Sequence, residues 1–238
     1  IGIADYEYMK FSYEVTEFAT SVKPFCITCL FDKFVDKTII YMDADTIIMS
    51  RFAEVEQAIS DGAELLLTPH ICKPLFDGMS PDEHSFILAG IYNLGFGVFR
   101  NTFEVRALVK WWEGKLSQYC IWDLDKGIHV DQKWMDYAPA FVENTKVLRH
   151  PGYNLAYWNM AHRTVTKENN QFYVNDLPLR FVHISGNSLK DKMNVSKHQK
   201  RFNRDNIGVL NEVFENYQER AVSSGQNETA LWHYSYQS

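Results

Sequence analysis

The chain has 238 residues, of which 46% are hydrophobic and 23% are charged, as is ordinary for a globular protein. Its net charge of −6 argues against a general nucleic-acid binder, and no apolar run approaches the roughly 20 residues that a membrane-spanning helix needs. No internal repeat, low-complexity tract or Gly/Ser/Pro-rich linker divides the sequence, so we expect a single domain over residues 1–238.

The predicted elements alternate between helices and strands along the chain. Residues 11–31 favour a helix. Thr38–Met42 is a short β-branched apolar run, which is typical of a buried strand. Residues 64–68 and 91–99 predict two further strands, the second of them broken by glycines.

Two amphipathic helices complete the pattern. Asn101 can cap the first, with Glu104 three residues further on, and the second spans residues 205–220 after a short strand over 181–184. Because strands alternate with helices, we expect an α/β fold with a mostly parallel central sheet flanked by helices. Each helix carries an apolar stripe at helical spacing, formed by Val105, Leu108, Val109, Trp112 and Leu116 in the first and by Ile207, Leu210, Val213, Phe214 and Tyr217 in the second.

A pair of carboxylates directly follows the first predicted strand. Asp43 and Asp45 are separated by one residue, and in open α/β sheets ligands bind outside the carboxyl ends of the strands. Two carboxylates this close repel each other unless a cation or hydrogen-bond donors compensate. Hard oxygen ligands favour Mg²⁺ or Mn²⁺, which also bridges phosphate oxygens. The pattern therefore predicts a metal site for a phosphate-bearing ligand; the alternative is a solvated turn, where Asp is common.

Two enzyme classes carry such an acidic pair. In GT-A glycosyltransferases, D-x-D holds a divalent ion against a nucleotide-sugar diphosphate. In haloacid-dehalogenase-like phosphatases, D-x-D-x-[TV] follows the first strand and its leading Asp is the nucleophile. Here Ile47 occupies the last position of the phosphatase motif, and the glycine usual before its later acidic motif is missing ahead of Asp131. These departures favour the glycosyltransferase.

Further motifs carry a resemblance to family 8-like GT-A glycosyltransferases. After D-x-D come an N-x-G strand, a D-Q pair and a terminal H-x-x-G, in the order of that family. The chain is also similar to a group of bacterial glycosyltransferases with YNLGF, a WW helix, DQKW, GYN-AYWN and an H-S-G segment. These motifs cover nearly the whole chain, at residues 92–96, 111–112, 131–134, 152–159 and 183–186.

The resemblance implies a GT-A fold and a metal centre. Asp43, Asp45 and His183 would bind Mn²⁺ or Mg²⁺, with Asp43 also near the ribose of the donor. The alternative for His183 is a hydrogen-bonded core histidine. The first strand and helix that normally cradle the nucleoside base have no counterpart here, so we expect the single GT-A-like catalytic domain to be incomplete at its N-terminal side.

The resemblance also implies donor-binding residues. Lys23 would face the donor, Asn93 would line its sugar, and Gly186 would let the backbone approach the diphosphate. Family 8 usually places a lysine where Leu189 stands here, and Lys190 would take over its phosphate contact. For Lys23 the alternative is a surface lysine near a helix end, and for Asn93 a turn residue at a strand edge.

Catalysis is assigned by the same resemblance to Asp131 and Gln132. Gln132 would lie below the anomeric carbon as a polar stabiliser of a retaining reaction, because an amide has no useful pKa for general-base catalysis. Asp131 would contact the sugar hydroxyls or the cation-like centre; its alternative is a helix N-cap. Tyr153, Tyr157 and Trp158 could form an acceptor platform, with core packing as the alternative for each.

The expected function is metal-dependent transfer of a sugar from a nucleotide-diphosphate donor, most simply a UDP-sugar, to a glycan, lipid-linked or protein acceptor. The alternatives are a Mg²⁺-dependent phosphatase or phosphoryl-transfer enzyme and a non-catalytic nucleotide-sugar-binding domain. A basic run over residues 190–204 is most simply a solvated loop; the alternative is a surface that docks anionic phosphates or a lipid-linked acceptor by peripheral contact with a membrane. The expected location is the cytoplasm, at the inner face of the membrane, and no nucleic-acid partner is expected.

Overall fold

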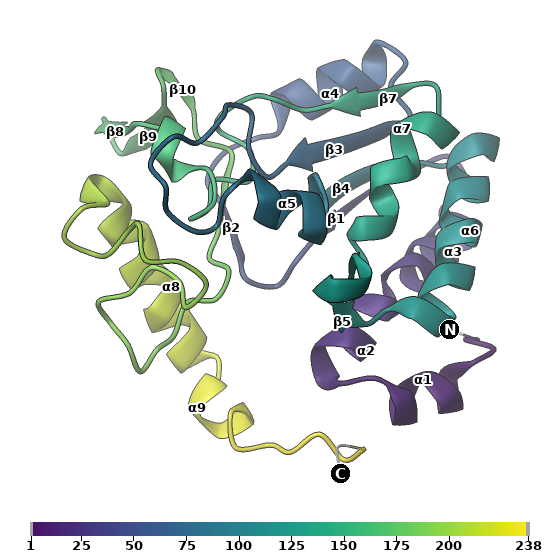
Figure 1. The fold of residues 1–238 in the computed structure, drawn as a ribbon. Helices are drawn as coiled ribbons and strands as arrows, with labels where there is room; N and C mark the ends of the chain where they lie inside the picture. Colours follow the sequence, from purple (N-terminus) through teal and green to yellow (C-terminus); the bar gives the residue numbers. More distant parts are fainter. Residues whose placement is uncertain (1, 237–238) are drawn as a thin grey trace.

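The structure, a computed structural model, describes residues 2–236 and has an α/β arrangement with a mixed central sheet (Figure 1). Four strands form this sheet, in the order β1 (Thr38–Met42), β4 (Tyr92–Arg100), β3 (Leu65–Pro69) and β7 (Thr145–Val147). β4 runs antiparallel to both β1 and β3, whereas β3 and β7 are parallel. The expectation of a mostly parallel sheet is therefore wrong, because the reversed β4 lies between two strands of the same direction.

Helices cover both faces of the sheet. Leu65 and Leu67 of β3 point into a core with α3 (Lys23–Lys33) and α6 (Phe103–Tyr119). Leu66, between them, points to the opposite face and packs with α4 (Ala53–Ser60). This alternation follows from the two-residue period of a strand. Near the first core lie α1 (Tyr6–Ser12), α2 (Val15–Ser21) and α7 (Ala138–Phe141).

A second group of elements packs around its own apolar cluster, beside the carboxyl end of β1 (Figure 1). Its helix α8 (Asn211–Ser223) buries Val213 and Phe214. The short helix α9 (Gln226–Thr229) follows, and α5 (Glu83–Ala89) lies between β3 and β4 in the chain. The remaining strands form small antiparallel sheets, namely β2 (Thr46–Ile48) with β11 (Phe181–His183), β5 (Trp122–Asp123) with β6 (Ile128–His129), and β8 (Val165–Glu168), β9 (Gln171–Val174) and β10 (Leu177–Pro178) together.

Several predicted elements form with altered ends. The predicted helix over residues 11–31 is divided among the end of α1, α2 and α3. The break before α3 is explained by Pro24, which stands in the first turn of α3, where a missing N–H is tolerated but a continuing helix is not. β1 forms as predicted but is only partly buried, since it ends the strand order of the sheet. The last predicted helix, over residues 205–220, forms as α8 and starts at Asn211, six residues later than predicted.

The cap of α6 differs from the prediction. Thr102 caps the helix, and its Oγ1 accepts a hydrogen bond from the Val105 N–H. The Asn101 amide instead donates to the carbonyl oxygens of Phe31 and Val35, so it ties the end of α3 to the start of α6. The predicted apolar stripe of α6 is confirmed, because all five of its residues are buried. Across residues 2–236, no helix combines the length and the apolar character that crossing a bilayer requires.

Candidate functional site

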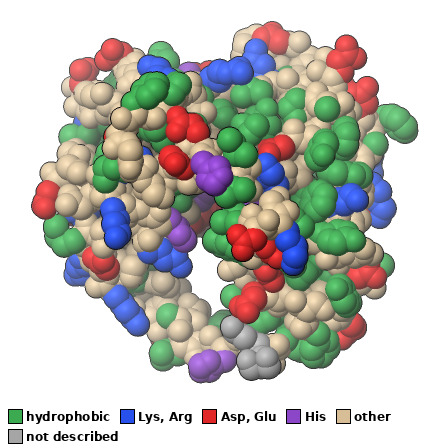
Figure 2. All heavy atoms as spheres, viewed as in Figure 1, with side chains coloured by type: hydrophobic (Ala, Val, Ile, Leu, Met, Phe, Trp, Pro, Cys, Tyr) green, Lys and Arg blue, Asp and Glu red, His purple; other side chains and the backbone are tan. Residues whose placement is uncertain are grey.

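Most of the predicted site residues converge on one cavity of about 480 Å³ at the carboxyl end of β1. The face of the molecule seen in Figure 2 is hollowed between the C-terminal helices and the N-terminal ones. Segments from across the chain line the cavity, and nine of the twelve predicted residues are among its walls: Lys23, Asp43, Asp45, Asn93, Asp131, Gln132, Tyr157, Trp158 and His183.

The acidic pair lies in the turn that joins β1 to β2. The backbone N–H of Asp43 still bonds to the Gly95 carbonyl oxygen (2.9 Å), and the chain then leaves the central sheet. β2 pairs with β11, which sets His183 opposite Thr46, and the Ile184 N–H donates to the Asp45 carbonyl oxygen (2.8 Å). This pairing brings a histidine 138 positions away in sequence beside Asp45.

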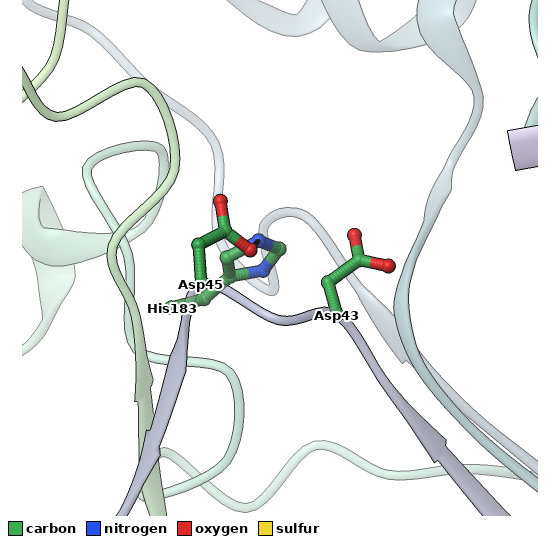
Figure 3. A group of neighbouring side chains, drawn as sticks. All are labelled: Asp43, Asp45 and His183. Carbon is green, nitrogen blue, oxygen red and sulfur yellow. Dashed lines mark ion pairs between the residues drawn. The ribbon is translucent and has the colours of Figure 1, made fainter. Parts of the chain in front are cut away.

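Asp45 and His183 lie against each other with Asp43 beside them (Figure 3), and one ligand atom from each of the three lies within 4.8 Å of the others. His183 Nε2 is 3.1 Å from Asp45 Oδ1. Burial alone would raise the pKa of Asp45, but the hydrogen bond and charge of His183 outweigh it and lower that pKa. Two carboxylates and one imidazole are ligands that Mn²⁺ and Mg²⁺ accept. The residues present therefore fit a divalent cation.

The hydrogen bond to the other ring nitrogen of His183 is also typical of a metal-binding histidine. His183 Nδ1 lies 3.1 Å from Asn154 Oδ1, which can only accept a hydrogen bond. Nδ1 therefore carries a proton, and Nε2 is the nitrogen that faces the acidic pair. Metal-binding histidines are usually held in this way, with the other ring N–H bonded to an oxygen. A hydrogen-bonded histidine, the alternative, also accounts for both nitrogens, because Nε2 lies 3.1 Å from Asp45 Oδ1; the presence of Asp43 in the same group is what favours a metal ligand.

A buried lysine joins the acidic pair to the predicted catalytic aspartate. Lys23 Nζ lies 3.2 Å from Asp43 Oδ1 and 2.9 Å from Asp131 Oδ2, and it donates to the Leu94 carbonyl oxygen (3.2 Å). Burial alone would lower the pKa of Lys23, but the negative charges of Asp131 and Asp43 outweigh it and raise that pKa. Tyr41 holds Asp43 at the same oxygen, since its hydroxyl donates to Asp43 Oδ1 at 2.6 Å.

This arrangement decides two of the open alternatives. Lys23 is 5% exposed, so it is not a surface lysine. Asp131 is 3% exposed and directs its carboxylate at Lys23 rather than capping a helix. Gln132 lies beside it in the cavity wall, where its Nε2 donates to the Ala89 carbonyl oxygen (3.0 Å) and lies 3.2 Å from His129 Nδ1. Both contacts hold the side-chain nitrogen, and Oε1 accepts from the Leu94 N–H at 3.5 Å.

The structure separates Tyr153 from the two other predicted acceptor residues. Tyr157 and Trp158 line the cavity. Tyr153 is 1% exposed and packs among Phe96 and Phe181, and its hydroxyl donates to Glu54 Oε2 (3.0 Å). Core packing therefore accounts for Tyr153, and the acceptor role expected of it is wrong in this structure.

Two predicted donor residues also lie outside the cavity walls. Lys190 is exposed in the loop that follows β11. Gly186 has φ 68°, and a Cβ there would lie 2.4 Å from His198 Cδ2, so the glycine serves close packing within the chain. The basic run is also partly occupied, because Arg201 pairs with Asp77 and Arg204 donates to the backbone oxygen of Asn211.

Several cavity residues had no prediction. Five of the eight histidines of the chain line this cavity: His70, His84, His129, His183 and His198. Four of them stand singly in segments with no recognisable pattern, so sequence reasoning had no reason to select them. Asn154 could have been selected from the sequence, because it belongs to the GYN-AYWN motif. In the structure it has a left-handed φ of 50°, which asparagine tolerates better than most non-glycine residues.

Comparisons with known proteins add relatives but no activity. No protein-family model matches the chain. The uncharacterized protein YfnD of Bacillus subtilis (strain 168) is 28% identical over 176 residues, and the uncharacterized protein YfnF of the same strain is 24% identical over 180 residues. The matches cover 73% and 75% of this chain but only 54% and 59% of the two relatives, so the chain spans little more than half of their length.

Proposed function

We propose that this chain is the metal-binding part of a GT-A glycosyltransferase that transfers a sugar from a nucleotide-diphosphate donor to an acceptor hydroxyl. The observation that carries the proposal is the convergence of Asp43, Asp45 and His183, with ligand atoms within 4.8 Å, in the wall of a cavity. A cavity of about 480 Å³ is within the usual size of small-molecule sites. The family resemblance of the motifs supports the same class.

The donor set assigns a role to each metal ligand. Asp43, Asp45 and His183 would hold Mn²⁺ or Mg²⁺, and the ion would supply Lewis-acid stabilisation of the charge that develops on a leaving diphosphate. Lys23 fixes the Asp43 carboxylate in place, because its ammonium is 3.2 Å from Asp43 Oδ1. Tyr41 does the same through its hydroxyl. The carboxylate that binds the ion is therefore positioned before any ligand arrives.

The cavity wall next to Lys23 offers groups for the sugar. Asp131 and Gln132 lie there, and the Lys23 ammonium bridges Asp131 to Asp43. We infer that this wall contacts the transferred sugar, with Gln132 as a polar group and Asp131 as a negative charge near the cation-like centre. Tyr157 and Trp158 supply aromatic surface on the side of His183. The donor base, the acceptor and retention of configuration are parts of the proposal that rest on the resemblance.

The test measures binding and slow hydrolysis of a panel of nucleotide sugars with and without Mn²⁺. We expect Mn²⁺-dependent binding by the wild type and loss on the order of 100-fold or more for Asp45→Ala, which removes a metal ligand. Asp36→Ala is the matched control, since Asp36 is an exposed aspartate outside the cavity walls.

Two other outcomes would assign the chain to a different class of protein, and a third would refute the metal centre. Release of phosphate from simple phosphate esters that depends on Mg²⁺ and on Asp43 would identify a phosphatase. Metal-dependent binding of a nucleotide sugar without turnover would identify a binding domain. Equal Mn²⁺ affinity in the wild type and in Asp45→Ala would refute the metal centre itself.

A further inference from the structure

A row of four buried polar side chains runs through the wall of the cavity and ends at His183. Three of them come from different parts of the fold: His70 follows β3, Asn93 belongs to β4, and Asn154 lies in the loop after β7. Their exposed fractions range from 0% to 8%. Consecutive members are joined by hydrogen bonds of 3.0–3.3 Å, from His70 to Asn93, from Asn93 to Asn154 and from Asn154 to His183.

The direction of the first bond is set by the backbone. His70 Nδ1 lies 3.2 Å from the carbonyl oxygen of Ile91, which can only accept, so Nδ1 carries a proton. Burial lowers the pKa of His70 to about 4, so the ring is neutral near pH 7 and its Nε2 is an acceptor. The group that lies 3.3 Å from this Nε2 is the Asn93 side-chain nitrogen, which therefore donates to it.

Each later bond inherits its direction from the one before. With its nitrogen toward His70, Asn93 presents Oδ1 to the Gly95 N–H (3.1 Å) and to the Asn154 side-chain nitrogen (3.0 Å). Asn154 must then present its own Oδ1 to His183 Nδ1. The Gly95 N–H is a second anchor, because a flipped Asn93 would point an N–H at another N–H.

The row is also enclosed sterically. The ring of His70 stacks on Phe86, with ring centres 4.9 Å apart and planes 15° apart. The Trp158 ring contacts both histidines edge-on, at 5.3 Å from His70 and 5.1 Å from His183. Neither imidazole can therefore turn over without displacing an aromatic neighbour.

We propose that His70, Asn93 and Asn154 are positioning residues that fix the proton of His183 on Nδ1 and direct its Nε2 at the metal centre. This inference rests on the proposed function and deepens it, because it assigns the affinity of the metal site in part to a histidine that binds no ligand. It also gives Asn93 a role other than the expected contact with the sugar, since its amide oxygen is already shared between two donors.

The first test is the Mn²⁺ affinity of variants, measured by electron paramagnetic resonance. His70→Phe keeps a ring for Phe86 to stack on but removes the acceptor of the Asn93 side-chain nitrogen, so the Asn93 amide keeps only the bonds at its oxygen and the row is held less firmly. We expect the Mn²⁺ dissociation constant to rise about 10- to 100-fold, the usual effect of losing an outer partner of a metal ligand. His70→Gln replaces the acceptor with an amide oxygen, and we expect it to restore most of the affinity.

His129→Phe is the matched control. His129 lines the same cavity, and burial lowers its pKa to about 4 as well, but it bonds to Gln132 and has no place in the row. We expect its Mn²⁺ affinity to stay within about twofold of the wild type. Equal losses in His70→Phe and His129→Phe would overturn the proposal, because they would show a general effect of disturbing the cavity.

The second test needs no metal and reads the tautomer of His183 by long-range ¹H–¹⁵N correlation spectra. In Asp45→Ala, which removes the other acceptor near the ring, we expect neutral His183 to carry its proton on Nδ1. A proton on Nε2, which a free imidazole side chain prefers, would overturn the proposal. This measurement separates the two hypotheses: a wild type that binds no Mn²⁺ refutes the metal centre, whereas the tautomer reports on the row alone.

Discussion

Replacing Gly95 with alanine should weaken the metal centre from the side of the central sheet. A Cβ at position 95 would lie 2.2 Å from His183 Cε1, 2.7 Å from His183 Nδ1 and 2.9 Å from Asn93 Oδ1. All three distances are shorter than any ordinary carbon contact, so a side chain must move. The backbone at position 95 is not at a positive φ, so the effect comes from this crowding and not from conformational strain.

The size of the effect follows from how little room His183 has. Its ring is 4% exposed, and Trp158 lies against it at 5.1 Å. Forcing an extra methyl group into such packing costs about 1–3 kcal/mol. At about 2–4 °C per kcal/mol for a chain of this size, the melting temperature should fall by about 2–12 °C. Because a metal ligand is displaced, the Mn²⁺ dissociation constant should also rise by about tenfold or more.

Gly97→Ala separates the two effects. Gly97 lies on the same strand, opposite Tyr41, and a Cβ there would meet the Phe99 ring at 2.7 Å rather than any of the three proposed metal ligands. It should lower the melting temperature in calorimetry by a similar amount but leave the Mn²⁺ affinity unchanged. If Gly95→Ala binds Mn²⁺ as tightly as the wild type, or if both variants lose affinity equally, the argument from crowding at His183 is refuted.

Three other predictions concern stability. The pKa of His70 is about 4 in the folded chain and about 6.5 when unfolded, so the free energy of unfolding should fall by about 3 kcal/mol as the pH drops from 6.5 to 4. Urea titrations of His70→Gln should show a smaller fall in the free energy of unfolding over the same pH range. Lys23→Met should lower the free energy of unfolding by about 3–5 kcal/mol by stranding the buried Asp131 carboxylate, and adding Asp131→Asn should recover part of that loss; purely additive losses would contradict the pairing. Glu54→Ala removes both bonds of the Arg180 guanidinium to its carboxylate and should cost about 1–3 kcal/mol in thermal unfolding without changing Mn²⁺ affinity.

The fold could be predicted from sequence where the pattern is local. The strand over Thr38–Met42 and the buried stripe of α6 follow from apolar runs and helical spacing, and both form. The direction of β4 could not be predicted in this way, because an apolar strand reads the same whichever way its neighbours run. The cap of α6 was decided by a tertiary contact, since the Asn101 amide is drawn to the end of α3 and leaves the cap to Thr102.

The sequence by itself indicated the acidic pair and the histidine that meets it. Asp43 and Asp45 follow a strand at a spacing that only a cation or donors can compensate, and the order of motifs pointed to His183 as their partner. Only the tertiary structure decided how those groups are held. The position of the Lys23 ammonium between Asp43 and Asp131, and the direction of each hydrogen bond behind His183, depend on atoms from separate strands and loops. Such contacts leave no periodic trace in a sequence, because each rests on one residue placed by long-range packing.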